Sequence, residues 1–123
     1  MSIAVLIAED EPNIVESLRF ILTRADCTVE VAYDGEEALS KLRRGRPDLL
    51  ILDVMLPKQN GFEVLKTLRG EHDLADLPVL ILTAKGQQKD RRTAEEMGAS
   101  AFLTKPFANQ DVIDLVQQLA GAA

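Results

Sequence analysis

The sequence predicts one α/β domain in which five parallel strands alternate with five helices. Five short apolar runs, each bounded by turn residues, alternate with five longer segments, and the length of 123 residues fits a single domain covering 1–123. Runs that are apolar on both faces are typical of strands buried in a parallel sheet. Crossovers between such strands are almost always right-handed, so a chain of this length fits a doubly wound sheet of strand order 2-1-3-4-5.

The five strands are expected at the short apolar runs. These runs cover residues 3–8, 28–33, 48–52, 78–82 and 99–103. In a sheet of this order, the chain leaves the first strand in one direction and returns for the third strand on the other side. The carboxyl ends of those two strands therefore border a crevice, which is where such sheets bind their ligands.

Four of the five intervening segments carry apolar residues at helical spacing. The first, second, third and fifth segments carry, in turn, Ile14, Leu18, Ile21 and Leu22; Ala38, Leu39 and Leu42; Phe62, Leu65 and Leu68; and Val112, Leu115, Val116 and Leu119. Residues spaced in this way share one face of a helix, so each of these helices is expected to pack that face on the sheet.

Three local signals mark where helices begin or end. Pro12 suits the first turn of a helix, where its missing N–H costs nothing. Asp34 is followed three residues later by Glu37, which resembles a capping box. Gly98 stands where a left-handed cap would end the fourth helix.

The fourth helix, expected at residues 87–97, differs from the others because it is almost wholly polar. Ala94 and Met97 are its main apolar anchors. A helix held by so little burial is expected to be marginally stable. Two interpretations stay open: a solvated surface helix, or a segment that moves in a conformational switch.

Composition excludes several classes of protein. The chain has 14 Lys and Arg residues against 20 Asp and Glu residues, and this net charge of −6 argues against nucleic-acid binding. The lone Cys27 excludes an internal disulfide and a cysteine-built metal site. The apolar runs are far shorter than the ~20 residues of a membrane-spanning helix, and no secretory signal follows Met1. We therefore expect a cytoplasmic domain that does not contact membranes.

Polar residues follow four of the five apolar runs. Glu9 and Asp10 follow the first run, Asp53 the third, Thr83 the fourth, and Lys105 closely follows the fifth. The carboxyl ends of parallel strands meet at one edge of a sheet, so we expect these groups to converge there. Each residue alone also has an ordinary structural explanation, but their joint occurrence on one edge indicates a site.

The predicted cluster suits phosphoryl chemistry. Its acids, Glu9, Asp10 and Asp53, would repel one another unless one is protonated or a cation is bound. Oxygen ligands without His or Cys suit a hard cation, and an incomplete cage with room for water suits Mg²⁺ better than Ca²⁺. A cation, the Lys105 ammonium and the Thr83 hydroxyl would together receive a tetrahedral dianion attached to a carboxylate. Such a receptor is typical of phosphoryl transfer to aspartate.

Six segments carry a family resemblance. They are IAEDEP (7–12), DGEEAL (34–39), DLLILDVMLP (48–57), NGF (60–62), LTA (82–84) and LTKPF (103–107). In this order they closely resemble the CheY-like receiver domain of two-component response regulators. The resemblance extends from Ile3 to about Leu119, and it implies the flavodoxin-like (βα)5 fold.

The resemblance assigns catalytic and metal-binding roles. Asp53 would be the phosphoacceptor. Asp10 would bind Mg²⁺ or Mn²⁺ directly, together with Asp53 and the backbone carbonyl of Met55, while Glu9 would act mainly through water. Met55 and Lys85 also occupy positions that tune the access of attacking water in this family.

The resemblance also assigns the switch. Thr83 would hydrogen-bond the phosphoryl group, Lys105 would pair with it, and the Lys105–Pro106 peptide bond would be cis. Phe102 stands at the position of the rotating switch aromatic, with an ordinary core role as the alternative interpretation. A phenylalanine there has no hydroxyl, so it cannot donate a hydrogen bond.

The implied function is a phosphorylation-activated signalling switch rather than a multiple-turnover enzyme. A sensor histidine kinase or a histidine phosphotransfer protein would supply the phosphoryl group. The surface formed by the fourth helix, the fifth strand and the last helix would then change for a downstream target protein, and a homodimer could form through the same surface.

Two other functions are alternative interpretations of the sequence. A flavodoxin-like electron carrier would need a Ser, Thr and Gly loop for the FMN phosphate, whereas residues 9–12 here read EDEP and repel phosphate. A receiver fold that serves only as a binding module would lack the acceptor or the lysine, and both Asp53 and Lys105 are present.

A few conspicuous residues are given structural roles. His72 is expected to be an exposed loop residue, and Cys27 a partly buried small hydrophobic residue. Phe20 lies off the stripe of the first helix, where it would contact either a docking partner or a neighbouring side chain. Ile113 flanks the stripe of the last helix and is a candidate for a partner or dimer surface.

Overall fold

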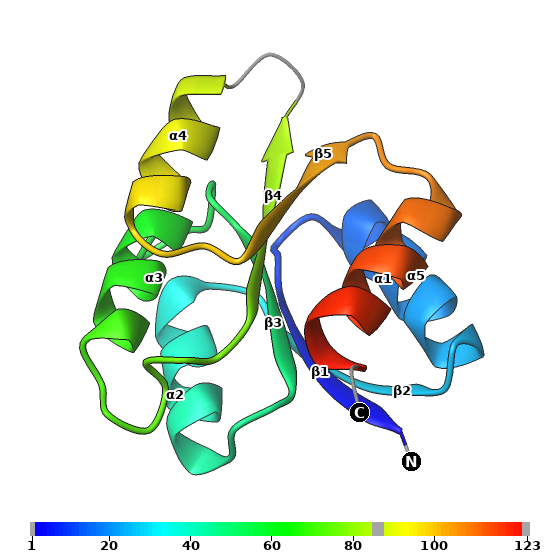
Figure 1. Cartoon of the computed structure of the whole chain (residues 1–123), viewed down its shortest axis with the longest axis horizontal. Helices are drawn as coiled ribbons and strands as arrows, with labels where there is room; N and C mark the ends of the chain where they lie inside the picture. The colour runs from blue at the N-terminus through cyan, green and yellow to red at the C-terminus, as the bar shows by residue number, and fades with distance from the viewer. Residues whose placement is uncertain (1, 85–87, 122–123) are drawn as a thin grey trace.

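The structure is a computed structural model that describes residues 2–84 and 88–121 (Figure 1). Its five strands are β1 (Ile3–Ala8), β2 (Cys27–Ala32), β3 (Leu49–Asp53), β4 (Val79–Ala84) and β5 (Ala101–Lys105). Its helices are α1 (Pro12–Arg24), α2 (Gly35–Arg44), α3 (Gly61–Arg69), α4 (Gln88–Glu96) and α5 (Asn109–Ala120). The strands form one parallel sheet of order β2-β1-β3-β4-β5, which confirms the predicted topology.

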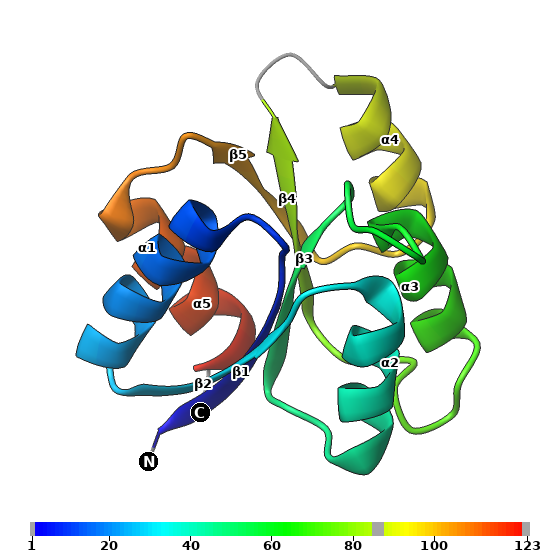
Figure 2. The ribbon, with the colours of Figure 1, turned by 180° about the vertical axis from the view of Figure 1, so that it is seen from behind.

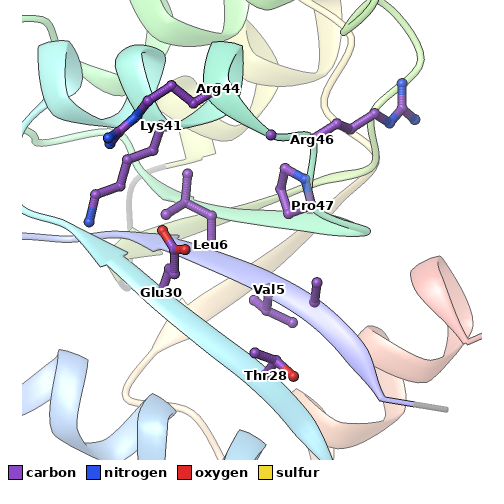
Figure 3. Close-up of a pocket in the computed structure, with 10 residues that line it drawn as sticks. Val5, Leu6, Thr28, Glu30, Lys41, Arg44, Arg46 and Pro47 are labelled. Atoms are coloured by element: carbon purple, nitrogen blue, oxygen red, sulfur yellow. The ribbon is translucent and has the colours of Figure 1, made fainter.

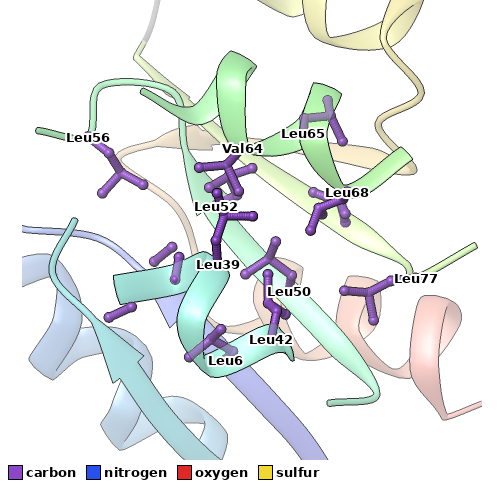
Figure 4. Packing of buried hydrophobic residues seen from close by; sticks show 14 of the residues in the cluster. Leu6, Leu39, Leu42, Leu50, Leu52, Leu56, Val64, Leu65, Leu68 and Leu77 are labelled. Carbon is purple, nitrogen blue, oxygen red and sulfur yellow. The ribbon is translucent and has the colours of Figure 1, made fainter. Parts of the chain in front are cut away.

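The helices cover both faces of the sheet. α1 and α5 lie on one face and α2, α3 and α4 on the other, as Figures 1 and 2 show from opposite sides. Two apolar clusters fill the layers between them, and every residue of β3 is buried. Figure 4 shows leucines of β3, α2 and α3 meeting in one of these clusters. In the described ranges, no helix is long and apolar enough to cross a membrane.

Strand boundaries differ from the prediction most at the fifth strand. β5 begins at Ala101, two residues later than expected, and it includes Lys105. Residue 99 instead closes the end of α4, where the Ala99 amide donates to the Ala94 carbonyl. Ser100 contacts Val79, the first residue of β4: its Oγ accepts from the Val79 amide, and its own amide donates to the Val79 carbonyl. The pairing of β5 with β4 continues through the polar residues Thr104 and Lys105, because the hydrogen bonds between strands come from the backbone and do not depend on the side chain.

The predicted helix signals are present in a modified form. Pro12 is the first residue of α1, and Gly98 has the expected positive φ of 98° after α4. Asp34 accepts from the Glu37 amide at 2.8 Å, but Glu37 reaches back to the Tyr33 amide rather than to that of Asp34. The predicted capping box is therefore only half formed. The first predicted residue of the fourth helix, residue 87, lies outside the described ranges.

A complete capping box, which the sequence analysis missed, starts α3. Asn60 accepts from the Glu63 amide at 3.0 Å, and Glu63 accepts from the Asn60 amide at 3.2 Å. The next residue, Gly61, brings the first turn of α3 against the end of β3. A Cβ at Gly61 would collide with the backbone of Asp53 and Val54. The absence of a side chain here fixes the position of the loop that follows β3.

Little packing holds α4. Among the α4 residues described, only Ala94 is buried. The C-terminal end of α4 is secured from outside by Arg69 of α3, whose Nε and Nη2 donate to the Gly98 carbonyl at 3.1 and 2.8 Å. Arg69 Nη1 also donates to the carbonyls of Ala75 and Leu77 at 3.1 and 2.8 Å. One guanidinium thus ties α3 and the loop before β4 to the end of α4.

Replacing Gly61 with alanine should destabilise the domain. The added methyl group has to displace the backbone at the end of β3, which costs about 1–3 kcal/mol of unfolding free energy in urea denaturation. Gly45→Ala is the matched control, because a Cβ there meets nothing within 4 Å, and its effect should stay within about 0.5 kcal/mol. Equal stabilities of the two variants would contradict the close-approach argument.

Arg69→Met should loosen α4 more than its neighbours. Losing this donor removes the hydrogen bonds to the carbonyls of Gly98, Ala75 and Leu77, at a net cost of about 0.5–1.5 kcal/mol for each bond. Amide hydrogen exchange should show reduced protection in α4 and residues 98–100, with smaller changes in α1. Lys66→Met, an exposed change on the same helix, is the control. Unchanged α4 protection in Arg69→Met would show that α4 is anchored by other contacts.

Candidate phosphoryl-acceptor and metal site

The carboxyl ends of the two central strands bring the acids together. Glu9 follows β1 directly and Asp53 ends β3, one position beyond the register pair Ala8 and Leu52. Glu9, Asp10 and Asp53 can each offer an oxygen such that all three lie within 4.8 Å of one another. Glu9 and Asp53 are buried, whereas Asp10 is exposed. The cluster therefore opens to solvent on the side of Asp10.

Lys105 reaches the acids from the far edge of the sheet. Its Nζ lies 2.9 Å from Asp53 Oδ2 and 3.3 Å from Glu9 Oε1, and its side chain is only 20% exposed. Lys105 pairs with Ala84 of β4, and β4 separates it from Asp53, so the long side chain spans one strand. The predicted convergence of these groups on one edge is what the structure shows. The Lys105–Pro106 peptide bond is cis, as expected.

Backbone amides hold both buried carboxylates in place. Glu9 Oε2 accepts from the amides of Asp10 and Glu11 at 3.0 and 3.3 Å. Asp53 Oδ1 accepts from the amide of Met55 at 2.9 Å. Each carboxylate thus turns one oxygen to the backbone and the other to Lys105. These amide contacts cannot be predicted from the sequence, because backbone donors leave no mark in a side-chain pattern.

The three central groups have displaced pKa values. Burial raises the pKa of Glu9 to about 7, and the neighbouring Asp53 carboxylate acts in the same direction. Burial alone would also raise the pKa of Asp53, but hydrogen bonds with Glu9, the Met55 amide and Lys105 hold it below its usual value. Burial opposes the charge on Lys105, yet both carboxylates raise its pKa. Two adjacent carboxyls share one site most easily when one keeps its proton.

Thr83 and Phe102 lie around this centre on β4 and β5. Thr83 is buried and stands one residue beyond Leu82, the register partner of Asp53. Phe102 is half-buried against the apolar cluster on the α3 and α4 side. The guanidinium of Arg91 lies over its ring, 4.9 Å from the centroid. Arg91 is not among the predicted site residues, because nothing in the order of residues pairs it with Phe102. Lys85 lies outside the described residues.

The open side of the cluster adjoins a shallow hollow of about 420 Å³. It is lined by Asp10, by residues of the loop after β3 and by two helical residues; these are Val54, Met55, Leu56, Pro57, Asn60, Phe62 and Asp90. The Met55 side chain is 68% exposed here. A ligand bound at the carboxylates thus has solvent access on this side, next to the first turns of α3 and α4.

Another hollow, of about 480 Å³, lies away from the acids between α2 and the first half of β1 and β2 (Figure 3). Three cations border it, but two already have partners. Lys41 donates to the Val31 carbonyl at 2.6 Å, and Arg46 pairs with Asp76 at 2.7 Å. Arg44 is the third. This hollow is separate from the candidate site, and the carboxylate cluster is the chemically distinctive feature of the molecule.

The remaining residues of interest lie outside the site. His72 is fully exposed and Cys27 is buried, close to expectation. Phe20 is 60% exposed, with Arg24 of the same helix 5.3 Å from its ring centroid, so its ring does not pack into the core. Ile113 is half-buried against the cluster beneath α1 and α5.

Fold and site together define a class: an α/β domain with a carboxylate at a topological switch point, surrounded by further acids and one lysine. Comparisons with known proteins agree. A family model described as response regulator receiver domain matches residues 5–117. The response regulator MprA of Mycobacterium tuberculosis is 41% identical over 119 residues, which are 97% of this chain and 51% of that protein.

Two solved structures place the fold in the same family. Chemotaxis response regulator CheY4 of Vibrio cholerae superimposes with a TM-score of 0.90 at 31% identity, covering 97% of this chain and 99% of that one. The receiver domain of sensor histidine kinase PA1611 from Pseudomonas aeruginosa, with a magnesium ion coordinated in its active site cleft, gives 0.91 at 25% identity and covers 99% and 100%.

The chain belongs to the response regulator receiver domain family. It is a phosphorylation-activated signalling domain of the two-component type, not a multiple-turnover enzyme. This membership decides against the flavodoxin-like electron carrier. The chain spans about half the length of the curated relatives it matches.

The metal-free protein should lose stability as the pH rises from 4.5 toward 7. Folded Glu9 keeps its proton in this window while unfolded Glu9 releases it, so the folded state binds more protons and its advantage falls. Asp53 and Lys105 titrate outside the window. Urea denaturation in the presence of a chelator should therefore show a flatter pH profile for Glu9→Gln than for wild type.

Glu16→Gln on the exposed face of α1 is the control, and it should keep the wild-type slope. Equal slopes for Glu9→Gln and wild type would mean that Glu9 ionises normally despite its burial.

Proposed function

We propose that Asp53 is the phosphoacceptor of this receiver domain and that a sensor histidine kinase or a histidine phosphotransfer protein is the donor. An Asp53 carboxylate oxygen attacks the phosphorus of a phosphohistidine. The P–N bond breaks, the imidazole leaves and takes up a proton, and an acyl phosphate forms. The observation that carries the proposal is the placement of Asp53, which lies buried between the Lys105 ammonium and the Met55 amide beside two further acids.

The donor set fits a divalent metal ion. Three carboxylates converge within 4.8 Å, with no His or Cys among them, and oxygen ligands of this kind suit Mg²⁺ or Mn²⁺. We assign Asp10, Asp53 and the backbone carbonyl of Met55 as ligands, with Glu9 acting mainly through water. The magnesium in the PA1611 receiver domain supports this assignment. When bound, the ion neutralises charge on the phosphoryl oxygens.

Side chains of the protein itself stabilise the transferred phosphoryl group and transmit the change to the surface. Lys105, already 2.9 Å from Asp53 Oδ2, is positioned to pair with a phosphoryl oxygen and to stabilise charge during transfer. The Thr83 hydroxyl, on the adjacent strand, donates to the phosphoryl group. Movement of Thr83 opens space for the Phe102 ring, and α4 shifts with it because little burial holds that helix. Phosphorylation thereby selects one of two surfaces.

The altered surface comprises α4, β5 and α5. This surface binds a downstream target protein or a second copy of the chain. We propose that residues 1–123 act as one receiver domain in the cytoplasm. Direct nucleic-acid binding by this domain is disfavoured by its net charge of −6. A phosphorylation-independent binding module is the competing function, and the test below separates the two.

Asp53→Asn should abolish covalent phosphate uptake from acetyl phosphate and Mg²⁺, as measured by intact-protein mass spectrometry. The amide is a poor nucleophile and loses the charge that attracts the metal. Asp73→Asn, a change at a fully exposed loop position, should leave uptake at the wild-type level. Wild-type uptake by Asp53→Asn, or none by wild type itself, would refute the assignment and favour the binding module.

A further inference from the structure

Phe102 has a charged partner on α4. Arg91 Cζ lies 4.9 Å from the centroid of the Phe102 ring, within the range of a cation–π interaction. Acidic residues are available on the same helix, at Asp90, Glu95 and Glu96. Arg91 nevertheless forms no salt bridge with any residue in the ranges 2–84 and 88–121. Its specific contact in the described structure is the aromatic face.

The chemistry of phenylalanine makes this contact consequential. A tyrosine at position 102 could fix its ring by a hydrogen bond from the hydroxyl, but phenylalanine has only its apolar edge and the negative potential of its face. A guanidinium over that face is the polar interaction such a ring can make. The Arg91 guanidinium therefore holds one face of the Phe102 ring through a cation–π interaction.

The ring also packs against an apolar cluster to which α4 contributes. Phe102 packs against the cluster that includes Ala94, the one buried residue among those described in α4, and Met97 packs on that cluster as well. Phe102 is thus linked to α4 in two ways, through the Arg91 contact and through the apolar cluster that it shares with the helix. A change in the position of Phe102 has to break or move the Arg91 contact.

We propose that Arg91 is a positioning residue that holds Phe102 in its half-buried place before phosphorylation and so sets the balance between the two states of the switch. This inference rests on the proposed function, in which the Phe102 ring turns into space vacated by Thr83. Arg91 does not touch the acceptor carboxylate. It acts through the ring, and it couples the position of α4 to the state of the site.

Arg92 provides a matched control. It is adjacent on α4, likewise exposed and of the same charge, and it has no ring contact among the described residues. Arg91→Met and Arg92→Met remove the same charge from the same helix. Arg91→Lys keeps a cation over the ring with weaker geometry. A general effect of charge on α4 would appear in both methionine variants, whereas a ring-specific effect appears in one.

The test uses protein with ¹³C-labelled phenylalanine rings and NMR spectra recorded without and with Mg²⁺ and beryllofluoride. In free Arg91→Met, the Phe102 ring signals should move toward their beryllofluoride-saturated positions. The active-to-inactive ratio should rise about two- to fivefold, the size expected from an exposed cation–π contact. Arg91→Lys should move part of the way, and Arg92→Met should match wild type.

The outcomes separate the two claims. If wild-type Phe102 responds to beryllofluoride but Arg91→Met and Arg92→Met have identical free spectra, the role of Arg91 is overturned and the proposed switch stands. If both methionine variants shift equally, the effect is one of charge on α4 and the positioning role is again overturned. If beryllofluoride binds but leaves the Phe102 ring of wild type unmoved, the aromatic switch itself is wrong.

Discussion

The contact between Lys105 and the paired carboxylates of Glu9 and Asp53 is the constraint around which the molecule is arranged. Two buried carboxyl groups at neighbouring strand ends would be strongly unfavourable without compensation. Lys105 supplies a charge from two strands away, and the amides of Asp10, Glu11 and Met55 supply directed donors. The parallel sheet makes this compensation available, because it gathers the ends of β1, β3 and β5 at one edge.

This balance also explains how a local covalent change can reach the surface. Lys105 and the acids share one network, so the proposed phosphorylation of Asp53 would redistribute the partners of Lys105. The strands that carry these groups are rigid and buried, whereas α4 is held by one buried alanine, the Arg69 clamp at its end and the Arg91 contact. Displacement is therefore expected to be easiest in α4, which buries fewer residues than any other described helix.

Local signals predicted the elements better than their ends. The apolar runs located all five strands, yet β5 begins two residues later than its run. The Ala99 amide bonds back to the end of α4, and Ser100 contacts the first residue of β4. Asp34 caps α2 as predicted, but the carboxylate of Glu37 accepts from the amide of Tyr33 instead of the amide of Asp34. The capping box at Asn60 and Glu63 follows the standard spacing of such boxes, but the apolar stripe of α3 alone does not reveal it.

The order of residues alone determined the strand order, the convergence of Glu9, Asp10, Asp53 and Lys105, and the family. Alternating buried runs leave few topologies, and polar groups follow four of the five runs. Only the tertiary structure decided which carboxylate oxygen faces Lys105 and which faces an amide, and which charged residue covers Phe102. Those choices depend on distances between segments far apart in the chain, and such distances exist only once the layers have packed.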